Sequence, residues 1–507
     1  MKSKTILLTA LAATLTMAAC GPIEDFTEVK LVADENIDIS FQNVSVHDPS
    51  VIRVGDTYYI FGSHLAVAKS DDLMNWDLVA SGVTPTNPVI PDAMTEMAEA
   101  FSWAQTNTFW APDVVQLADG RFYMYYCNCE GSSPLSALGI AVADDVEGPY
   151  RDLGIILKSG MNGESENAGE RYDARVHPNV IDACVFYDKE GRLWMMYGSY
   201  SGGIYALELD IETGFPLKSG YGKKMLGMNH LRIEGPYVIY NPETDYYYMF
   251  LSYGGLGVND GYNIRVCRSK NPDGPYHDAA GTDMIECQGT PGTFFNDRDT
   301  ERYGAKLMGN YKWQWREGEE GQDRLAYKSP GHNSAIYQEE SGKYFNIFHT
   351  RFEKSGQNHA VRTHQFFFNE DGWPVVLPYR YVGEVIGRYK KEEIAGIYKY
   401  LNHGMDITDE IKYSKEIILQ KSGQVTGPTA DDPANTAAVI GSWQLRDGNK
   451  AELSIYGQTY KGVFCKAYDE FGRKYVMTFT AMSADGVSVW GSSLAAVEAD
   501  WYHGGNR

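Results

Sequence analysis

Five segments of this 507-residue sequence share one pattern, a turn residue followed by a strand rich in tyrosine and phenylalanine. Each follows another short apolar strand, so the repeating unit is a β-hairpin. The segments read Gly55-DTYYIFGS, Gly120-RFYMYYCN, Gly191-RLWMMYGS, Asp245-YYYMFLS and Gly342-KYFNIFHT, with starts 65, 71, 54 and 97 residues apart. Repeats of this length with several short strands are typical of propeller blades. We therefore predict an all-β fold with a five-bladed β-propeller over residues 40–388.

The remaining residues, 389–507, change character and predict a second, smaller domain. Short alternating strands such as GSWQL, KAELSIYG, KGVFCKAYD and KYVMTFTAMS follow a loop rich in Thr, Ala, Asp and Pro. Short strands separated by turn signals favour an antiparallel β-barrel or sandwich. Helical periodicity is almost absent from the whole sequence.

The first residues predict a targeting segment. Lys2 and Lys4 precede an apolar run that ends in small residues before Cys20. This pattern predicts a lipoprotein signal peptide over residues 1–19 and a linker over 20–39, with ordinary secretion as the alternative. Nothing later in the sequence is apolar enough to span a membrane. We expect an exported chain held in the bacterial cell envelope by a lipid on Cys20, with the outer-membrane surface as one location.

Composition argues against one class of partner. The sequence has 67 Asp and Glu against 45 Lys and Arg, a net charge of −22, which argues against a surface that neutralises nucleic-acid phosphates. Its 36 Tyr and 10 Trp supply flat rings of the kind that stack on sugar faces. The six cysteines after Cys20 lack the paired C-x-x-C spacing of a metal site, and no disulfide pairing is predicted. We expect a monomer.

The register of the repeat predicts a cluster of ionisable residues. When the first strands of the hairpins are aligned on their apolar pair, the residue three places earlier is Asp48, Ala111, Asp182, Glu234 or His332. Because the innermost strands of a propeller face its central channel, we expect these positions to form a ring at one mouth. Carboxylates that crowd together raise the pKa of at least one of them, which suits acid/base chemistry. Ordinary turn or capping residues are the alternative.

Motifs at these positions resemble glycoside hydrolase family 43. They are HDPSVI at 47–52, FWAPDVV at 109–115, IDACVFYD at 181–188, IEGPYVIY at 233–240 and PGHNSAI at 330–336. The runs GSYSGGIY at 198–205 and FFFNEDGWPVVLPYRYVGE at 366–384 resemble endo-1,5-α-L-arabinanases that carry an added C-terminal β-domain. The resemblance implies a five-bladed propeller that hydrolyses internal α-1,5-L-arabinofuranosidic bonds of arabinan.

The resemblance also implies roles for the ring residues. Asp48 resembles the general base, Glu234 the general acid, and Asp182 the carboxylate that orients the acid and adjusts its pKa. An inverting glycosidase needs such an acid and base on opposite faces of the sugar, and no nucleophile. His332 resembles the histidine that holds a calcium ion in the channel with water around it. The alternative for His332 is a hydrogen-bonded channel histidine.

Five further residues are candidates for substrate binding. The ring of Trp110 suits sugar stacking, although a core position between blades is its alternative. The others come from the resemblance, and the full set is Trp110, Asn179, Ser199, Tyr200 and Gly202. Arg362 is expected to bind a carboxylate or to form a surface ion pair. The histidines near the motifs, at 47, 64 and 177, are predicted to pack or to form hydrogen bonds.

Two other functions stay open on the sequence alone. An exo-acting α-L-arabinofuranosidase or β-xylosidase of the same family would use the same three carboxylates, and only the outer loops would differ. The insertion over residues 294–328 is either a cleft wall with aromatic subsites or a cap. A non-catalytic glycan-binding propeller would use the ring only to bind sugar hydroxyls. The length of the products from linear arabinan separates these cases.

Overall fold

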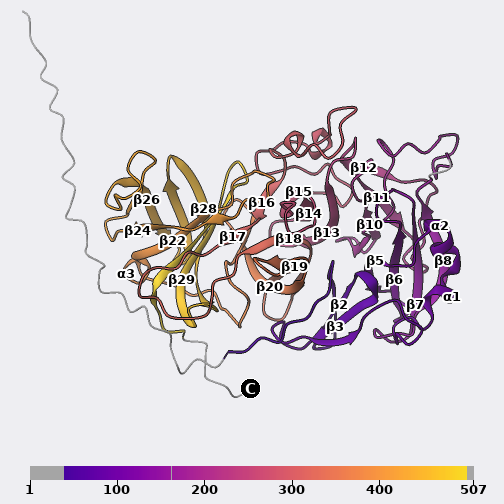
Figure 1. Ribbon diagram of the computed structural model, residues 1–507, viewed down its shortest axis with the longest axis horizontal. Helices are drawn as coiled ribbons and strands as arrows, with labels where there is room; N and C mark the ends of the chain where they lie inside the picture. The colour runs from indigo at the N-terminus through magenta and orange to yellow at the C-terminus, as the bar shows by residue number, and fades with distance from the viewer. Residues whose placement is uncertain (1–38, 161–162, 500–507) are drawn as a thin grey trace, which may run out of the picture.

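A computed structural model describes residues 39–160 and 163–499 of the chain. The predicted signal peptide and Cys20 lie outside these residues. The described chain is all-β, with a five-bladed propeller beside a closed barrel (Figure 1). No helix among the described residues is long and apolar enough to cross a membrane.

The first three blades are antiparallel sheets of four strands each, in chain order from the channel outward. Blade 1 contains β1 (Ser50–Val54), β2 (Thr57–Gly62), β3 (Ala66–Ser70) and β4 (Asp77–Ala80). Blade 2 contains β5 (Trp110–Gln116), β6 (Phe122–Cys129), β7 (Ser136–Ala143) and β8 (Arg151–Lys158). Blade 3 contains β9 (Cys184–Tyr187), β10 (Leu193–Tyr197), β11 (Ile204–Leu209) and β12 (Lys223–Leu226).

Blade 4 repeats this arrangement, and blade 5 extends it. Blade 4 contains β13 (Ile233–Asn241), β14 (Tyr246–Tyr253), β15 (Asn263–Ser269) and β16 (Ala305–Met308). Blade 5 contains β18 (Tyr327–Gln338), β19 (Lys343–Phe352), β20 (His359–Phe368) and β21 (Pro374–Val376). Its sheet gains two short strands, β17 (Tyr311–Lys312) and β23 (Lys412–Tyr413), which pair in parallel. The five predicted hairpins are the first two strands of each blade, namely β1–β2, β5–β6, β9–β10, β13–β14 and β18–β19.

The tyrosine-rich second strand of each hairpin is buried because neighbouring blades cover both of its faces. Every residue of β6, with the sequence FYMYYCNC, is buried. Between blades 1 and 2 the chain forms two short helices that the sequence pattern did not predict, α1 (Ala93–Glu96) and α2 (Ala98–Ala104). Another short helix, α3 (Lys391–Ile394), precedes the barrel, and the 3-10 turns are η1 (Ser63–Leu65), η2 (Met284–Glu286) and η3 (Asp297–Asp299).

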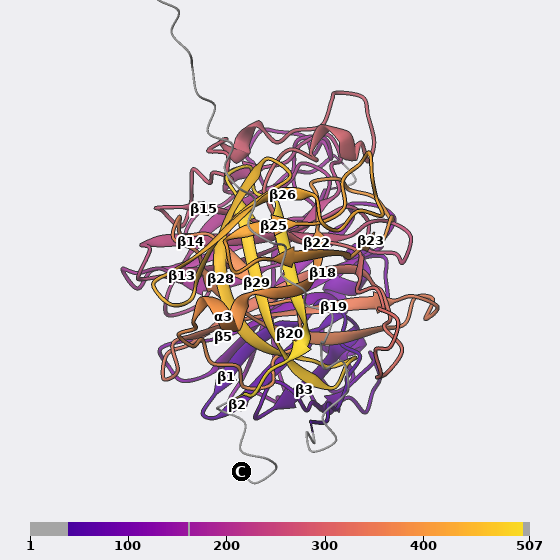
Figure 2. The ribbon, with the colours of Figure 1, turned by 90° about the vertical axis from the view of Figure 1, so that its left-hand side faces the viewer.

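The second domain is a closed barrel of eight strands, so the barrel alternative holds and the sandwich does not. Figure 2 looks onto the barrel with the propeller behind it. Its strands are β22 (Gly396–Asn402), β24 (Lys415–Leu419), β25 (Gln424–Thr426), β26 (Val439–Arg446), β27 (Lys450–Ile455), β28 (Gln458–Asp469), β29 (Lys474–Ser483) and β30 (Ser488–Ala496). Strand β23 lies between β22 and β24 in the chain but belongs to blade 5.

The barrel and the propeller share one apolar core. Trp313 from the segment before blade 5 lies in the same buried cluster as Trp490 of β30 and Trp373 beside β21. Buried charges reinforce the contact, since Lys399 of β22 pairs with Glu319 of the propeller insertion at 2.5 Å. The two domains therefore pack as one body.

Candidate active site

The predicted ring positions meet at the centre of the propeller. Asp48, Ala111, Asp182 and His332 all have positive φ, at 56°, 27°, 60° and 43°. They line one small cavity of about 10 Å³, enough for about one water-sized group. In blade 4 the equivalent residue is Gly235, with φ 59°, rather than Glu234. The sequence alignment is therefore wrong by one residue in blade 4.

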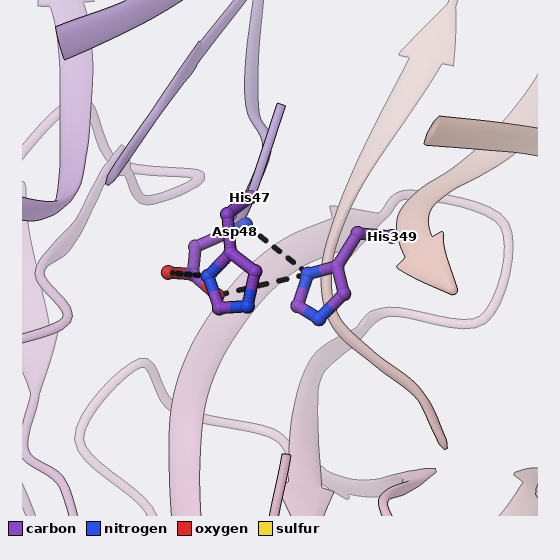
Figure 3. A group of neighbouring side chains, drawn as sticks. All are labelled: His47, Asp48 and His349. Carbon is purple, nitrogen blue, oxygen red and sulfur yellow. Dashed lines mark hydrogen bonds and ion pairs between the residues drawn. The ribbon is translucent and has the colours of Figure 1, made fainter. Parts of the chain in front are cut away.

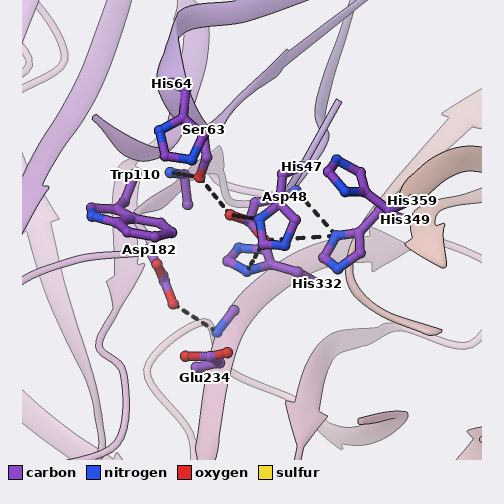
Figure 4. Close-up of polar contacts among 12 residues, drawn as sticks. His47, Asp48, Ser63, His64, Trp110, Asp182, Glu234, His332, His349 and His359 are labelled. Atoms are coloured by element: carbon purple, nitrogen blue, oxygen red, sulfur yellow. Dashed lines mark hydrogen bonds and ion pairs between the residues drawn. The ribbon is translucent and has the colours of Figure 1, made fainter. Parts of the chain in front are cut away.

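The one-residue offset gives Glu234 a different place from the other two carboxylates. It lines a cleft of about 630 Å³ together with Trp110 and Ile181, each of which also stands one residue before its ring position. Gly235 lets the chain pass the channel, because a Cβ there would lie 3.1 Å from the ring of His332. Asp48 and Asp182 thus face the channel, while Glu234 faces the cleft (Figure 4).

Asp48 is buried and held from several sides. His47 Nδ1 lies 2.6 Å from its Oδ2, the Ser63 hydroxyl donates to the same oxygen, and His332 Nδ1 lies 3.0 Å from its Oδ1. Burial alone would raise the pKa of Asp48. The charges of His332 and His47 and their hydrogen bonds outweigh burial, so the pKa lies well below its usual value. Asp48 is therefore an ionised carboxylate, as a general base must be.

A second layer of basic groups lies behind Asp48 (Figure 3). The Asp48 amide donates to His349 Nδ1 at 3.1 Å, and the rings of His47 and His349 stack at 4.1 Å. Arg351 Nη2 lies 3.4 Å from His47 Nε2. Because an ionised carboxylate only accepts, His47 Nδ1 carries the proton that it donates to Asp48.

His47, Asp48 and His349 each bring one candidate ligand atom to within 4.8 Å of the others. The guanidinium of Arg351 faces both imidazoles, at 3.4 Å from each Nε2. Its positive charge opposes a cation there, and the two Nδ1 atoms are already engaged with Asp48. We assign this cluster to hydrogen bonding.

Asp182 and Glu234 form the other half of the site. Burial raises the pKa of Asp182 to about 8, with the charge of His332 opposing the rise and that of Glu234 adding to it. The Gly235 amide donates to Asp182 at 3.2 Å, so Asp182 is bound to the residue that follows Glu234. The hydroxyls of Ser199 and Tyr262 donate to separate oxygens of Glu234, each at 2.7 Å.

The channel residues suit a hard cation. His332, the predicted metal ligand, lines the cavity together with two carboxylates and Asn333. The Asn333 Oδ1 atom is buried and has no hydrogen-bond partner among the described residues. Oxygen donors of this kind are those that calcium prefers. Burial would lower the pKa of His332, but the charges of Asp48 and Asp182 raise it to about 10, so a cation and a proton compete for this imidazole.

A second ring of polar residues supports the first, and sequence reasoning missed it. A polar residue lies at or near the end of each tyrosine-rich strand, and four of these bind the ring or cleft residue of the next blade. Ser63 Oγ accepts from the Ala111 amide and Ser252 Oγ from the His332 amide. Ser199 donates to Glu234, and His349 accepts from the Asp48 amide. The ends GS, GS and LS of three quoted segments, and the His349 one residue before the end of the fifth, carried this signal.

Four of the five candidate substrate residues line the cleft with Glu234, namely Trp110, Asn179, Ser199 and Tyr200. The Trp110 indole is half-buried and donates to Cys129 O at 3.1 Å. Gly202 is not in the lining. A Cβ at Gly202 would come within 2.3 Å of the backbone of Val176, so close packing requires glycine there.

Other sequence expectations have clear outcomes. Among the described residues, Arg362 forms no ion pair with a carboxylate. It is buried and donates to Tyr327 Oη and Asn43 Oδ1, each at 3.1 Å. His64 and His177 form hydrogen bonds, to Thr108 and to Glu170, as predicted. The six described cysteines are buried and unpaired.

Comparison with known proteins agrees with the motifs. A family model described as glycosyl hydrolases family 43 matches residues 37–374, more than half of the chain. The chain belongs to this family. A second model, a C-terminal lipocalin-like domain, matches residues 378–491 of this family 43 protein.

Relatives of the family 43 chain extend over most of its length. It is 53% identical over 453 residues to extracellular endo-alpha-(1->5)-L-arabinanase 2 of Bacillus subtilis, covering 89% of this chain and 93% of the relative. The crystal structure of the family 43 YxiA protein from Bacillus licheniformis has a TM-score of 0.85 at 54% identity, covering 90% and 99% of the two chains. Endo-1,5-alpha-L-arabinanase from Thermotoga petrophila has a TM-score of 0.83 at 49% identity, covering 90% and 100%.

Proposed function

We propose that this chain hydrolyses internal α-1,5-L-arabinofuranosidic bonds of arabinan with inversion at the anomeric carbon. The observation that carries the proposal is the set of three buried carboxylates with different environments, Asp48 and Asp182 at the channel cavity and Glu234 in the cleft. The likeness to two proteins named endo-arabinanases, at about 50% identity over about 90% of the chain, supports the substrate.

Asp48 acts as the general base. It accepts a proton from a water molecule while that water's oxygen attacks the anomeric carbon. His47, Ser63 and His332 hold its carboxylate ionised and in one orientation. The carboxylate therefore needs little reorganisation when the proton arrives.

Glu234 acts as the general acid. It donates its proton to the glycosidic oxygen as the bond from that oxygen to the anomeric carbon breaks. Ser199 and Tyr262 fix its two oxygens toward the cleft. Burial keeps a proton on Asp182 beside Glu234 up to a pH of about 8, so a proton is available next to the acid.

We also propose a calcium ion in the channel, held by His332 with oxygen ligands from the cavity. When bound, such an ion would supply positive charge close to the reacting carboxylates. Its test is turnover and melting temperature measured together for His332→Ala and for chelated enzyme, with calcium added back. Full turnover in His332→Ala, with no metal detected in the wild type, would contradict the proposed calcium site.

The experiment for the main proposal is hydrolysis of linear debranched arabinan by the wild type and by Glu234→Gln. We expect oligosaccharide products from the wild type, an inverted anomer by NMR, and a loss of about 10²–10⁴-fold in Glu234→Gln. Monomeric arabinose as the sole product would indicate exo action. A retained anomer would contradict the mechanism.

Export and anchoring complete the proposal. Both relatives are named extracellular, and the lysines and apolar run before Cys20 follow a lipoprotein signal pattern. We expect the wild type in the membrane fraction and Cys20→Ser in the soluble exported fraction. The same fractionation of both proteins would contradict a lipid on Cys20.

A further inference from the structure

Two neighbouring phenylalanines on the loop between β15 and β16 expose their rings at the cleft. Phe294 is 68% exposed and Phe295 is 49% exposed, and no other described phenylalanine is exposed to a similar degree. Exposed apolar surface costs about 25 cal/mol per Å² relative to burial. Exposed aromatic rings side by side therefore indicate a binding surface.

The loop holds these rings in place. The ring of Phe294 stacks on His230 with centroids 4.0 Å apart and planes at 12°, while Phe295 meets Tyr200 edge-on at 5.4 Å. The Phe295 amide donates to His230 O at 3.2 Å, although Phe295 has the unfavourable φ of 52°. A backbone strained in this way persists only where the surroundings enforce it.

An ion pair anchors the other side of the loop. Arg232, two residues before Glu234, donates through two nitrogens to Asp297 at the start of η3. Both side chains are mostly buried, at 20% and 14% exposure. A paired guanidinium and carboxylate fix orientation as well as distance. The aromatic surface is therefore tied to the residue that precedes β13, the strand that carries Glu234.

The surface and the proposed acid belong to one cleft. Phe294, Phe295 and Glu234 all line the cavity of about 630 Å³, which also contains Trp110. Of the insertion over residues 294–328, Phe294 and Phe295 line this cavity. We propose that Phe294 and Phe295 form a distal sugar-binding subsite, where an arabinofuranosyl unit of the chain remote from the bond being cleaved stacks on the ring of Phe294. This inference rests on the proposed function.

The chemistry of the Phe294 ring and its surroundings fits an arabinofuranosyl unit. A furanosyl unit presents C–H groups on its ring face and hydroxyls at its rim, which suits a flat apolar ring with polar groups nearby. His230 backs the ring of Phe294, so only the opposite face is free to receive a sugar. Because the cleft is continuous with Glu234, a polymer bound for cleavage runs past this surface.

The test compares long and short substrates. We measure kcat/KM for linear arabinohexaose and arabinotriose with Phe294→Ala, Phe294→Trp and Phe294→Leu. Loss of one stacking contact of about 1.4 kcal/mol corresponds to a tenfold change. We expect the hexaose-to-triose ratio to fall about tenfold in Phe294→Ala and Phe294→Leu, through KM, and to stay near the wild-type ratio in Phe294→Trp. Tyr413→Ala removes an aromatic ring of 49% exposure from β23 and should leave both values unchanged.

Two outcomes would overturn the subsite. One is an equal fall on both substrates, which would mean that Phe294 only supports the loop. The other is a Phe294→Ala variant whose kcat/KM equals that of the wild type on both substrates. If the wild type hydrolyses neither substrate, the proposed function fails, and calorimetric titration of arabinohexaose then decides the subsite alone. A Kd about tenfold weaker in Phe294→Ala than in the wild type supports it, and equal Kd values overturn it.

Discussion

At the residue scale, the site depends on how each carboxylate is surrounded. Asp48 accepts from His47 and Ser63 and faces His332, so it stays ionised. Asp182 has one backbone donor and buried surroundings, so it holds a proton up to a pH of about 8. Two chemically identical side chains are thereby given opposite protonation states by their surroundings.

His47 is a positioning residue for Asp48, and its substitution tests this. His47→Leu removes the N–H that faces Asp48, whereas His47→Asn keeps a donor at the position of Nδ1. We expect kcat on arabinan to fall on the order of 10–100-fold in His47→Leu, as for other groups that orient a functional side chain, and clearly less in His47→Asn. Melting temperatures measured in parallel control for folding. Equal losses in the two variants would assign His47 to packing.

The raised pKa of Asp182 predicts a pH dependence. Below a pH of about 8 Asp182 holds a proton in the site, and above it that proton is lost. Because the acid step needs a proton in this part of the site, the activity should decline on the alkaline side with an apparent pKa near 8. Asp182→Asn has no carboxyl group to titrate there, so this decline should move away from pH 8. Profiles of kcat/KM from pH 5 to 10 for both proteins measure this, and an unmoved alkaline limb would contradict it.

The sequence could predict which residues meet, but not each residue's orientation. The repeat register brought Asp48, Asp182 and His332 together because blades repeat the same inner strand. It misplaced Glu234 by one residue, because Tyr237 in blade 4 looks like part of the apolar pair while Gly235 has the positive φ. His349 and Arg351 lie over 300 residues from His47 in sequence, and only the folded propeller brings these three together.

At the scale of elements, the hairpins were predictable and the additions to them were not. A Tyr/Phe-rich strand after a turn is a short apolar run that the sequence shows clearly, whereas the two-residue strands β17 and β23 are too short to show a pattern. Strands of a barrel and of a sandwich show the same alternation of apolar and polar residues, so the sequence could not separate the two folds. The pairing of β22 with β30 closes the sheet into a barrel. The propeller closes by side chains, since Asp48 of blade 1 meets His332 and His349 of blade 5.

The insertion is also an element that joins domains, through a cluster of buried charges. Glu319 pairs with Lys399 at 2.5 Å, and Arg324 pairs with Asp469 at 2.7 Å. Glu319 is 2% exposed at its side chain, and Lys474 lies 3.8 Å from it. Removing the charge of Glu319 leaves Asp469 as the one anion of this cluster, facing the three cations Arg324, Lys399 and Lys474.

We expect Glu319→Gln to lower the free energy of unfolding by about 3–5 kcal/mol, because it leaves buried charge uncompensated. Urea denaturation measures the change. Glu340→Gln is the matched control, since Glu340 pairs with Arg53 at 2.6 Å but is 66% exposed. An exposed pair contributes about 0–1 kcal/mol. Similar effects of the two substitutions would show that the cluster does not hold the domains together.

At the scale of the whole molecule, the chain is two folds with one core. The sequence predicted two domains because the strand pattern changes near residue 390, but it did not indicate that they share an apolar core. Trp313, Trp373 and Trp490 belong to one buried cluster that draws on blade 4, blade 5 and the barrel. The segment after β22 returns to the propeller, where Arg265 donates to Met405 O at 2.6 Å.

This shared core predicts that the propeller and the barrel unfold together. Separating them would expose the tryptophan cluster and unpair the Glu319 charges at the same time, so a state with one domain folded gains little stability. We expect a single calorimetric transition for the wild type, with the calorimetric enthalpy equal to the van't Hoff enthalpy. In Trp490→Ala, which leaves a cavity at the contact, the transition should move to lower temperature and lose this equality as the two domains separate. Two resolved transitions in the wild type would contradict the shared core, and an unchanged transition in Trp490→Ala would show that this tryptophan stabilises the barrel alone.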